Sequence, residues 1–263
     1  MCVKYGFIGC GNMGSAIATA LAKVTTDIMI CDRTGKARVL AENLRIHYAD
    51  AESVVNNCER IFLAVKPQMM ASVLEPLQPV LRAKKPVLIT MAAGLKLSRI
   101  EEMAGTPLPV IRIMPNTPVS VGYGMTQYCC NRLVDAQTVD SFLSDMRYCG
   151  KLDKLDESLI DAASALSGCG PAYMYLFIES LVDAAVECGV PEDKAIEYAS
   201  ATMAGAAEMV LQTNQKPEAL RKAVCSPGGS TLAGLKVLED QGFRSTVADC
   251  IYAAYRRSQE LGK

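Results

Sequence analysis

The glycine pattern near the N-terminus restricts the fold of this chain more than any other feature. Gly9, Gly11 and Gly14 have the spacing G-x-G-x-x-G, directly after the apolar run VKYGFI and at the start of a helical pattern. In such a turn the first glycine permits a tight bend, the second lets backbone approach a pyrophosphate, and the third lets the helix pack closely on the strand. The helix N-terminus then favours the phosphates. The pattern predicts a dinucleotide-binding turn formed by Ile8, Gly9, Cys10, Gly11, Asn12, Met13 and Gly14.

Short apolar runs alternate with helical patterns through the first half of the chain. Near-continuous apolar strands separated by helices are typical of a parallel, doubly wound sheet. Two later runs are expected to add edge strands around a helix at about 135–148. The expected strands are 3–8, 27–31, 61–65, 86–91, 109–114, 124–130 and 149–155.

The second half is rich in Ala, Met, Leu and Glu at helical spacing, with no convincing strand after about Asp156. The sequence therefore predicts an α/β chain, with a Rossmann-type domain over 1–155 followed by an all-α domain over 156–263. A stripe of small residues allows close helix packing, either within the chain or in a homodimer, which we favour. The stripe comprises Ala195, Ala199, Thr202 and Ala206, and the expected helices are 171–189, 191–213, 217–224, one after Gly229 and one from about Arg244.

Asp32 follows the second strand, where an acidic side chain accepts hydrogen bonds from the adenosine ribose and favours NAD. Arg33, Thr34 and Lys36 follow at once and could hold the 2′-phosphate of NADP. These two signals conflict, so the sequence predicts Asp32 and Arg33 as cofactor contacts and leaves NADH against NADPH open.

Three further strand ends carry residues suited to a cofactor cleft, because ligands of such sheets lie at the carboxyl ends of the strands. The turn after the third strand has Lys66 and Pro67, and we expect Lys66 to contact phosphate or ribose rather than to transfer a proton. The turn after the strand at 86–91 consists of small residues, and the turn after the strand at 109–114 presents Asn116 in MPNTP. The predicted contacts are Ala64, Val65, Lys66, Pro67, Ala92, Ala93 and Asn116.

Composition excludes several classes of function. The 27 Lys and Arg residues balance 28 Asp and Glu residues without a basic run, which argues against a nucleic-acid partner. No apolar run has the roughly 18 residues that a membrane span needs, and we expect a cytoplasmic protein. His47, the only histidine, is expected at the surface or a sheet edge, so no metal site is predicted. The 11 cysteines are expected to be mostly buried thiols, among them Cys31, Cys58, Cys149, Cys188 and Cys250.

A second glycine-rich stretch, CSPGGST at 225–231, precedes a helical pattern in the second half. A Ser or Thr N-cap explains the hydroxyl residues but not the glycine pair. An anion held by successive backbone N–H groups explains both, so this stretch is the candidate site for a substrate anion.

The chain resembles pyrroline-5-carboxylate reductases along its whole length. The motifs that carry this resemblance are GFIGCGNMG, AVKPQ, AAG, RIMPNTP, SGCGPAY and SPGGSTLAGLKVLE, in the family's order. The last two are specific, whereas many dehydrogenases share the glycine turn. The resemblance implies NAD(P)H-dependent reduction of the cyclic imine 1-pyrroline-5-carboxylate to L-proline, and an intertwined dimer that can assemble into rings.

The resemblance also implies roles in the second glycine stretch. The hydroxyl of Ser226 and the N–H groups of Ser230 and Thr231 would hold the substrate carboxylate. The Thr231 hydroxyl would face the ring nitrogen as an orienting hydrogen bond, because it has no useful acidity near neutral pH. Many family members carry a neutral residue where this chain has Asp32. The substrate stretch is Ser226, Pro227, Gly228, Gly229, Ser230 and Thr231, with Thr231 as the catalytic candidate.

Two alternatives remain at this stage. β-Hydroxyacid dehydrogenases have a similar glycine turn and use a lysine of the helical domain as acid-base catalyst; Lys194 is the central lysine here, in the ordinary helix start PEDKA. The other alternative is a nicotinamide-binding sensor without turnover. The presence of both the cofactor turn and the substrate stretch argues against it.

Overall fold

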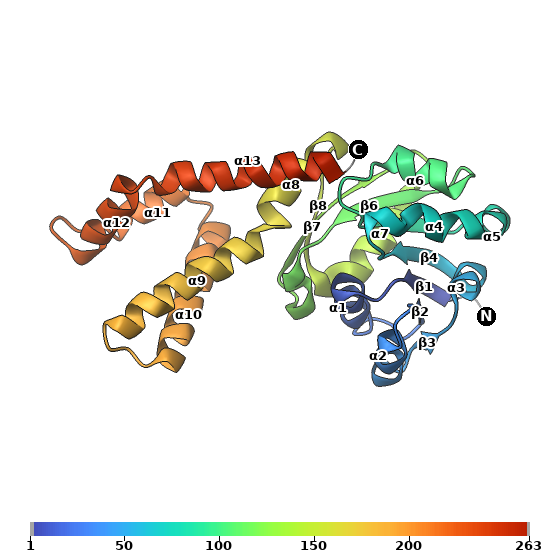
Figure 1. The fold of residues 1–263 in the computed structure, drawn as a ribbon, viewed down its shortest axis with the longest axis horizontal. Coiled ribbons are helices and arrows are strands. Elements are labelled where there is room, and N and C mark those ends of the chain that lie inside the picture. Colours follow the sequence, from blue (N-terminus) through green and yellow to red (C-terminus); the bar gives the residue numbers. More distant parts are fainter. Residues whose placement is uncertain (1–2, 262–263) are drawn as a thin grey trace. The chain divides into compact units, whose positions relative to one another are not determined.

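An eight-stranded sheet forms the first half of the computed structural model, which describes residues 3–261 (Figure 1). The strand order is β3-β2-β1-β4-β5-β6-β7-β8, with parallel pairing from β3 through β6 and an antiparallel β6–β7 pair. This confirms the predicted doubly wound fold. The strands are β1 (Val3–Ile8), β2 (Ile28–Cys31), β3 (His47–Tyr48), β4 (Cys58–Leu63), β5 (Val87–Thr90), β6 (Val110–Met114), β7 (Gly124–Cys130) and β8 (Gly150–Lys154).

Helices cover both faces of the sheet, as the unbroken apolar strands require. One buried cluster joins the sheet to α3 (Ala51–Asn57), α4 (Met70–Leu74), α6 (Leu97–Ala104) and α8 (Glu157–Ser167). The other joins it to α1 (Asn12–Leu21), α2 (Lys36–Leu44) and α7 (Ala136–Asp145), and contains a stacked pair, Phe7 and Phe62, with ring centroids 4.5 Å apart. Helix α5 (Gln78–Lys84) contributes Leu81 to the first cluster. The short 3₁₀ turns are η1 (Pro67–Met69), η2 (Glu75–Leu77), η3 (Thr117–Val121) and η4 (Met146–Cys149).

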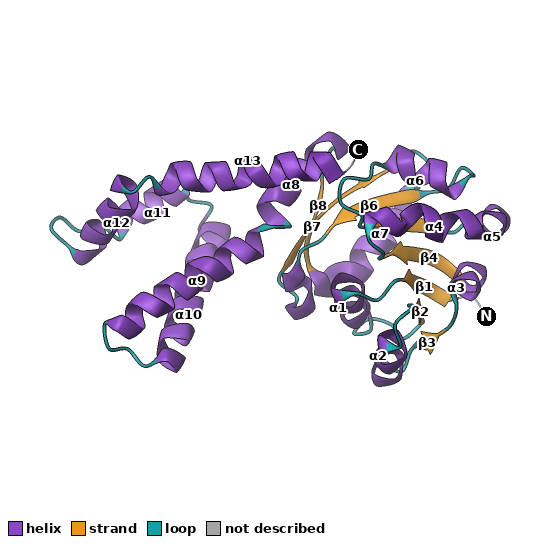
Figure 2. Cartoon of the chain, viewed as in Figure 1, coloured by secondary structure: helices purple, strands orange, loops and turns teal. Residues whose placement is uncertain are grey.

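Residues after the sheet are helical, as expected, and Figure 2 shows loops but no strand between α9 and α13. Contacts divide the chain into two compact units, one reaching Pro171 and resuming at Ala254, the other Ala172–Ala253. The sheet ends at Lys154, beside the predicted boundary at 155, but α8 packs on the sheet through buried Ile160. The last helices are α9 (Gly170–Glu187), α10 (Glu192–Thr213), α11 (Pro217–Ala223), α12 (Ser230–Asp240) and α13 (Phe243–Leu261).

Several predicted element bounds differ from the structure. Strand β4 begins at Cys58 rather than at residue 61, because Arg60 lies over the ring of buried Tyr5, 5.5 Å from its centroid, and so occupies a sheet position despite its charge. The helix expected to reach 148 ends at Asp145 and continues as a 3₁₀ turn. The two-residue strand β3, which the sequence did not predict, places exposed His47 at the sheet edge, as expected for that residue.

Cysteine burial follows the two halves of the chain. Cys31, Cys58 and Cys149 are buried, as predicted, whereas Cys188, which follows α9, is exposed and Cys250 is half-buried. Burial raises the pKa of Cys149 from 9.0 to about 12. The native state therefore holds a neutral thiol over a pH range in which the unfolded chain loses that proton.

We predict that this thiol makes the fold sensitive to alkali. Its stabilising contribution is present below about pH 9 and is lost as pH rises toward 12, by about 1.4 kcal/mol per pH unit. Denaturant unfolding across this range should therefore show a shallower decline for Cys149→Ala than for the unchanged chain. Cys188→Ala, at an exposed position, serves as the control and should keep the original slope. Equal slopes for the Cys149 variant and the unchanged chain would contradict the prediction.

Candidate active site

The carboxyl ends of β1, β2, β4, β5 and β6 share one edge of the sheet because these strands are parallel. The chain leaves β1 for β2 and β3 on one side and crosses to β4 and β5 on the other, so the strand order reverses beside β1. Ligands of open α/β sheets bind at such a switch point. Every cofactor contact predicted from the sequence lies at the carboxyl end of one of these five strands or follows it.

The glycine turn after β1 has the geometry that its spacing predicts. Gly9 has φ +99°, and a Cβ there would lie 2.6 Å from the Ala64 carbonyl oxygen. A Cβ on Gly14 would lie 2.6 Å from the carbonyl oxygen of Gly9, so α1 packs directly on the turn. Gly11, the N-cap of α1, faces open space and has φ −68°, which any residue adopts. Packing therefore requires glycine at 9 and 14, whereas the open face of Gly11 leaves room for a ligand.

We predict that Gly11→Ala weakens dinucleotide binding at least about tenfold without destabilising the fold, because the new methyl group occupies the space that a pyrophosphate needs. Titration calorimetry with the cofactor and a melting curve would measure the two effects. Gly205→Ala, the same change in α10 with no atom nearby, is the control and should keep the affinity. Unchanged cofactor affinity in Gly11→Ala would remove this turn from the binding site.

A cavity of about 600 Å³ lies against this turn. Of the predicted contacts, Cys10, Gly11, Asn12 and Asp32 line it, together with Thr34 and Lys36. The sequence did not predict Ser15, Ala16, Thr19 and Ser120 as lining residues; Ser15 and Thr19 lie four residues apart on α1, which was the available signal, whereas Ser120 comes from η3. The polar lining and the open helix N-terminus fit a dinucleotide phosphate and ribose.

Asp32 is fixed by two backbone hydrogen bonds. Its Oδ2 accepts from the N–H of Cys10 at 2.8 Å, and its Oδ1 accepts from the N–H of Thr34 at 2.6 Å. Partial burial raises the pKa of Asp32, but these hydrogen bonds and the charge of Arg33 lower it more, so the net pKa lies below its usual value. The carboxylate is therefore ionised at neutral pH.

The remaining predicted contacts lie on the same edge but do not line this cavity. Lys66 is exposed at the start of η1, and Arg33 donates from Nη2 to the sulfur of Met69 at 3.4 Å. The small residues after β5 are buried or half-buried. Those outside the cavity lining are Ile8, Gly9, Met13, Gly14, Arg33, Ala64, Val65, Lys66, Pro67, Ala92, Ala93 and Asn116.

Asn116 has a structural role that the sequence did not predict. Its Nδ2 donates to the Ser167 carbonyl at 2.9 Å and its Oδ1 accepts from the Met125 N–H at 2.9 Å. The Ser167 hydroxyl in turn donates to Gln127 at 3.0 Å. Asn116 therefore fixes the end of α8 to the sheet edge, and a direct contact with the cofactor stays a prediction.

A buried charge cluster holds the start of α8 against the sheet. The side chain of Arg112 on β6 is fully buried, with Nη2 2.6 Å from Asp161 Oδ1 and Nη1 3.4 Å from Glu157 Oε1. Glu157 also accepts the N–H of Leu97 at 2.6 Å, at the first turn of α6. The cluster joins β6, α6 and α8, the helix that leads into SGCGPAY.

The second glycine stretch forms the N-terminus of α12. Gly228 has φ +73°, and a Cβ on Gly229 would lie 2.5 Å from the Ser226 hydroxyl. Gly229 is the N-cap, and no side chain caps the helix. The first N–H groups of α12, including those of Ser230 and Thr231, therefore receive no side-chain cap, and the positive φ of Gly228 and the crowding at Gly229 account for both glycines.

Neighbouring cations on α11 and α12 are engaged by carboxylates of the same unit. Arg221 pairs with Glu239 at 2.9 Å, and Lys236 with Asp240 at 2.9 Å. Lys194, the residue that a β-hydroxyacid dehydrogenase would require, is exposed on α10 and pairs with Glu197 at 3.0 Å. Within residues 3–261, no group of three or more His, Cys, Asp or Glu side chains is arranged to hold a metal ion.

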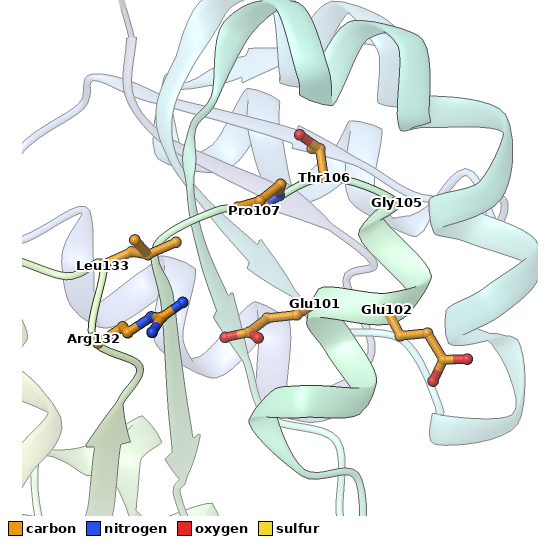
Figure 3. Close-up of a pocket in the computed structure, with 7 residues that line it drawn as sticks. All are labelled: Glu101, Glu102, Gly105, Thr106, Pro107, Arg132 and Leu133. Carbon is orange, nitrogen blue, oxygen red and sulfur yellow. The ribbon is translucent and has the colours of Figure 1, made fainter.

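A different cavity, of about 350 Å³, lies at the opposite edge of the sheet, before β6 and after β7 (Figure 3). In Figure 3 the side chains of Glu101 and Arg132 extend toward one another across it. Glu101 also accepts from Asn131 at 2.6 Å, which ties α6 to the loop after β7. No predicted cofactor or substrate residue lies there.

The glycine turn at the switch point, the ionised Asp32 and the helical second half define a dinucleotide-binding oxidoreductase. Residues 157–261 match the family model described as pyrroline-5-carboxylate reductase dimerisation, and residues 4–94 match the one described as NADP oxidoreductase, coenzyme F420-dependent. The chain is 38% identical to a pyrroline-5-carboxylate reductase of Synechocystis over the full length of both, and 36% identical to that of Escherichia coli over 99% of this chain and 98% of the relative. The chain belongs to the pyrroline-5-carboxylate reductase family, as its motifs predicted.

Solved structures agree with this assignment. The enzyme of Plasmodium falciparum with NADP bound has a TM-score of 0.90 and 35% identity, covering 99% of this chain and 98% of that one. The protein from Coxiella burnetii has a TM-score of 0.89 and 34% identity over the full length of both chains. A Mycobacterium tuberculosis 3-hydroxyisobutyrate dehydrogenase, at 12% identity, shares the fold alone. No helix within residues 3–261 is long and apolar enough to cross a membrane.

Proposed function

We propose that this chain reduces 1-pyrroline-5-carboxylate to L-proline, with NADH or NADPH as the hydride donor. Membership of the reductase family supports the reaction, and the observation that carries the substrate assignment is the uncapped N-terminus of α12 behind Gly228 and Gly229. When bound, the reduced nicotinamide supplies a hydride to the imine carbon. The nitrogen ends with a proton, so substrate, reduced cofactor and one proton give proline and oxidised cofactor.

The substrate carboxylate is held by backbone rather than by a cation in this proposal. The N–H groups of Ser230 and Thr231 and the hydroxyl of Ser226 supply the hydrogen bonds, because the nearby Arg221 and Lys236 are paired with carboxylates. The Thr231 hydroxyl orients the ring nitrogen, and a protonated iminium or a water completes the proton transfer. Positioning and electrostatics are sufficient for this reaction, which needs neither a nucleophile nor a metal.

The cofactor contacts proposed from the sequence fit the first unit. Gly11 and the N-terminus of α1 receive the pyrophosphate, and Asp32 receives the adenosine ribose. Lys66 and Pro67 after β4, and Ala92 and Ala93 after β5, face the nicotinamide half of the cleft in this proposal.

A homodimer is the proposed assembly. In the unit Ala172–Ala253, Val182 and Ala195 are the buried apolar side chains among the described residues, while Leu176 is 64% and Tyr198 58% exposed. Several helices with so much exposed apolar surface require a partner. The match to a dimerisation model over residues 157–261 supports a second copy of the chain. We also propose that these dimers assemble into rings and that the protein is cytoplasmic.

The direct test mixes the purified chain, substrate and either reduced cofactor, and follows proline formation and cofactor oxidation together. Both must occur in equal amounts and depend on the substrate. Absence of proline, with a folded protein that binds cofactor, would overturn the proposed function. Proline should also inhibit by competition, because it shares the substrate's carboxylate.

A further inference from the structure

We propose that Asp32 makes the adenosine end of the cleft selective for NADH over NADPH. This inference rests on the proposed function only in that the cleft binds a nicotinamide dinucleotide. It concerns one group, the 2′ position of the adenosine ribose, which is a hydroxyl in NADH and a phosphate in NADPH.

The position of Asp32 supports selection of a hydroxyl. Its two oxygens each accept one backbone N–H, from Cys10 at 2.8 Å and from Thr34 at 2.6 Å, so the carboxylate is held rigidly in the lining of the 600 Å³ cavity. An ionised carboxylate has about four lone-pair sites, more than the two backbone N–H groups and the Thr34 side chain occupy. A ribose hydroxyl can donate to the carboxylate, whereas a phosphate offers only acceptors and negative charge at neutral pH.

Charges around the cavity do not compensate a 2′-phosphate. Lys36 lines the cavity and balances the charge of Asp32. Arg33 is drawn toward Met69, and Arg38 lies over the ring of Tyr48, 5.3 Å from its centroid, so neither arginine lines the cavity. In the lining of the cavity one cation therefore stands against one carboxylate, while Arg33, whose charge also acts on Asp32, lies outside the lining and donates to Met69.

Binding of the adenosine half alone tests this inference without turnover. Calorimetry would compare ADP-ribose with 2′-phospho-ADP-ribose on the unchanged protein, on Asp32→Asn and on Glu42→Gln, a matched loss of one negative charge from the exposed side of α2. We expect the unchanged chain and Glu42→Gln to bind ADP-ribose about tenfold or more tightly than its phosphorylated analogue. Asp32→Asn should reduce the difference to less than about threefold.

Equal or tighter binding of the phosphorylated probe to the unchanged chain would overturn the inference, and this comparison does not depend on any variant folding. If Asp32→Asn folds, as judged by its melting curve, and keeps the full preference, Asp32 is not its source and the inference fails. The proposed function has a separate outcome. If the chain prefers ADP-ribose but makes no proline, the inference about Asp32 holds and the proposed function fails. If the chain makes proline but prefers the phosphorylated probe, the proposed function holds and the inference fails.

Discussion

Replacing Arg112 by leucine is expected to lower the free energy of unfolding by about 3 kcal/mol or more. The guanidinium is fully buried, and its removal leaves the carboxylates of Asp161 and Glu157, 18% and 28% exposed, without their cation. Leaving a partly buried charge without its partner lowers the free energy of unfolding much more than losing a surface ion pair does. Because the cluster joins β6 to α8, the start of α8 should also become less firmly held against the sheet.

Denaturant unfolding measures this loss, with Arg99→Leu as the matched control. Arg99 pairs with Glu102 on the surface of α6, so its loss should change the free energy of unfolding by less than about 1 kcal/mol. The double variant Arg112→Leu with Asp161→Leu should recover part of the stability, because it also removes one stranded carboxylate. A loss below about 1 kcal/mol for Arg112→Leu alone would show that the cluster does not hold the unit together.

Replacing Gly229 by alanine is expected to lower kcat/KM for the imine about 100-fold while cofactor affinity stays unchanged. The new Cβ would lie 2.5 Å from the Ser226 hydroxyl and 3.1 Å from its carbonyl oxygen. Either Ser226 or the first turn of α12 must therefore move, and the carboxylate loses aligned donors. Steady-state kinetics and cofactor titration on the same preparation separate the two effects.

The matched control is Gly234→Ala, within α12, where an added Cβ meets no atom within 4 Å. This variant should keep its activity within about threefold, since an alanine is favourable in a helix interior. If Gly229→Ala were as active as Gly234→Ala, the substrate anion would bind elsewhere.

Local constraints were predicted well from the sequence. Each glycine of the first turn has a separate steric reason that is encoded within a few residues, and the structure gives Gly9, Gly11 and Gly14 the expected surroundings. The same applies to the strands of the parallel sheet, because an apolar run of that length has few other stable arrangements.

Long-range partnerships were not predictable. Arg112 reads as a charge within an apolar strand, and its partners lie 45 and 49 residues further along the chain. Asn116 was predicted as a cofactor contact because it follows a strand, yet its hydrogen bonds go to Ser167 and Met125, whose proximity only the fold creates. A sequence pattern predicts which side chains lie at the edge of the sheet. It does not predict which of them form hydrogen bonds with other parts of the protein.

The second glycine stretch lies between these cases. The sequence indicated an anion site because a hydroxyl N-cap would explain the Ser and Thr residues but not the glycine pair. The structure places Gly229 at the N-cap with no side-chain cap. Glycine is needed at position 229 because a Cβ there would lie 2.5 Å from the hydroxyl of Ser226, three residues earlier. A turn of this kind is local in sequence but is visible only in three dimensions.

Hydride transfer from the nicotinamide C4 to the imine carbon can be followed directly with an isotopic label. The purified chain would be given 1-pyrroline-5-carboxylate and NADH carrying deuterium at both C4 positions of the nicotinamide, so that either face delivers the label, and the proline formed would be analysed by mass spectrometry and NMR. We predict one deuterium at C5 of proline. Unlabelled proline, or no proline from a folded chain that binds the cofactor, would contradict hydride transfer to the imine carbon.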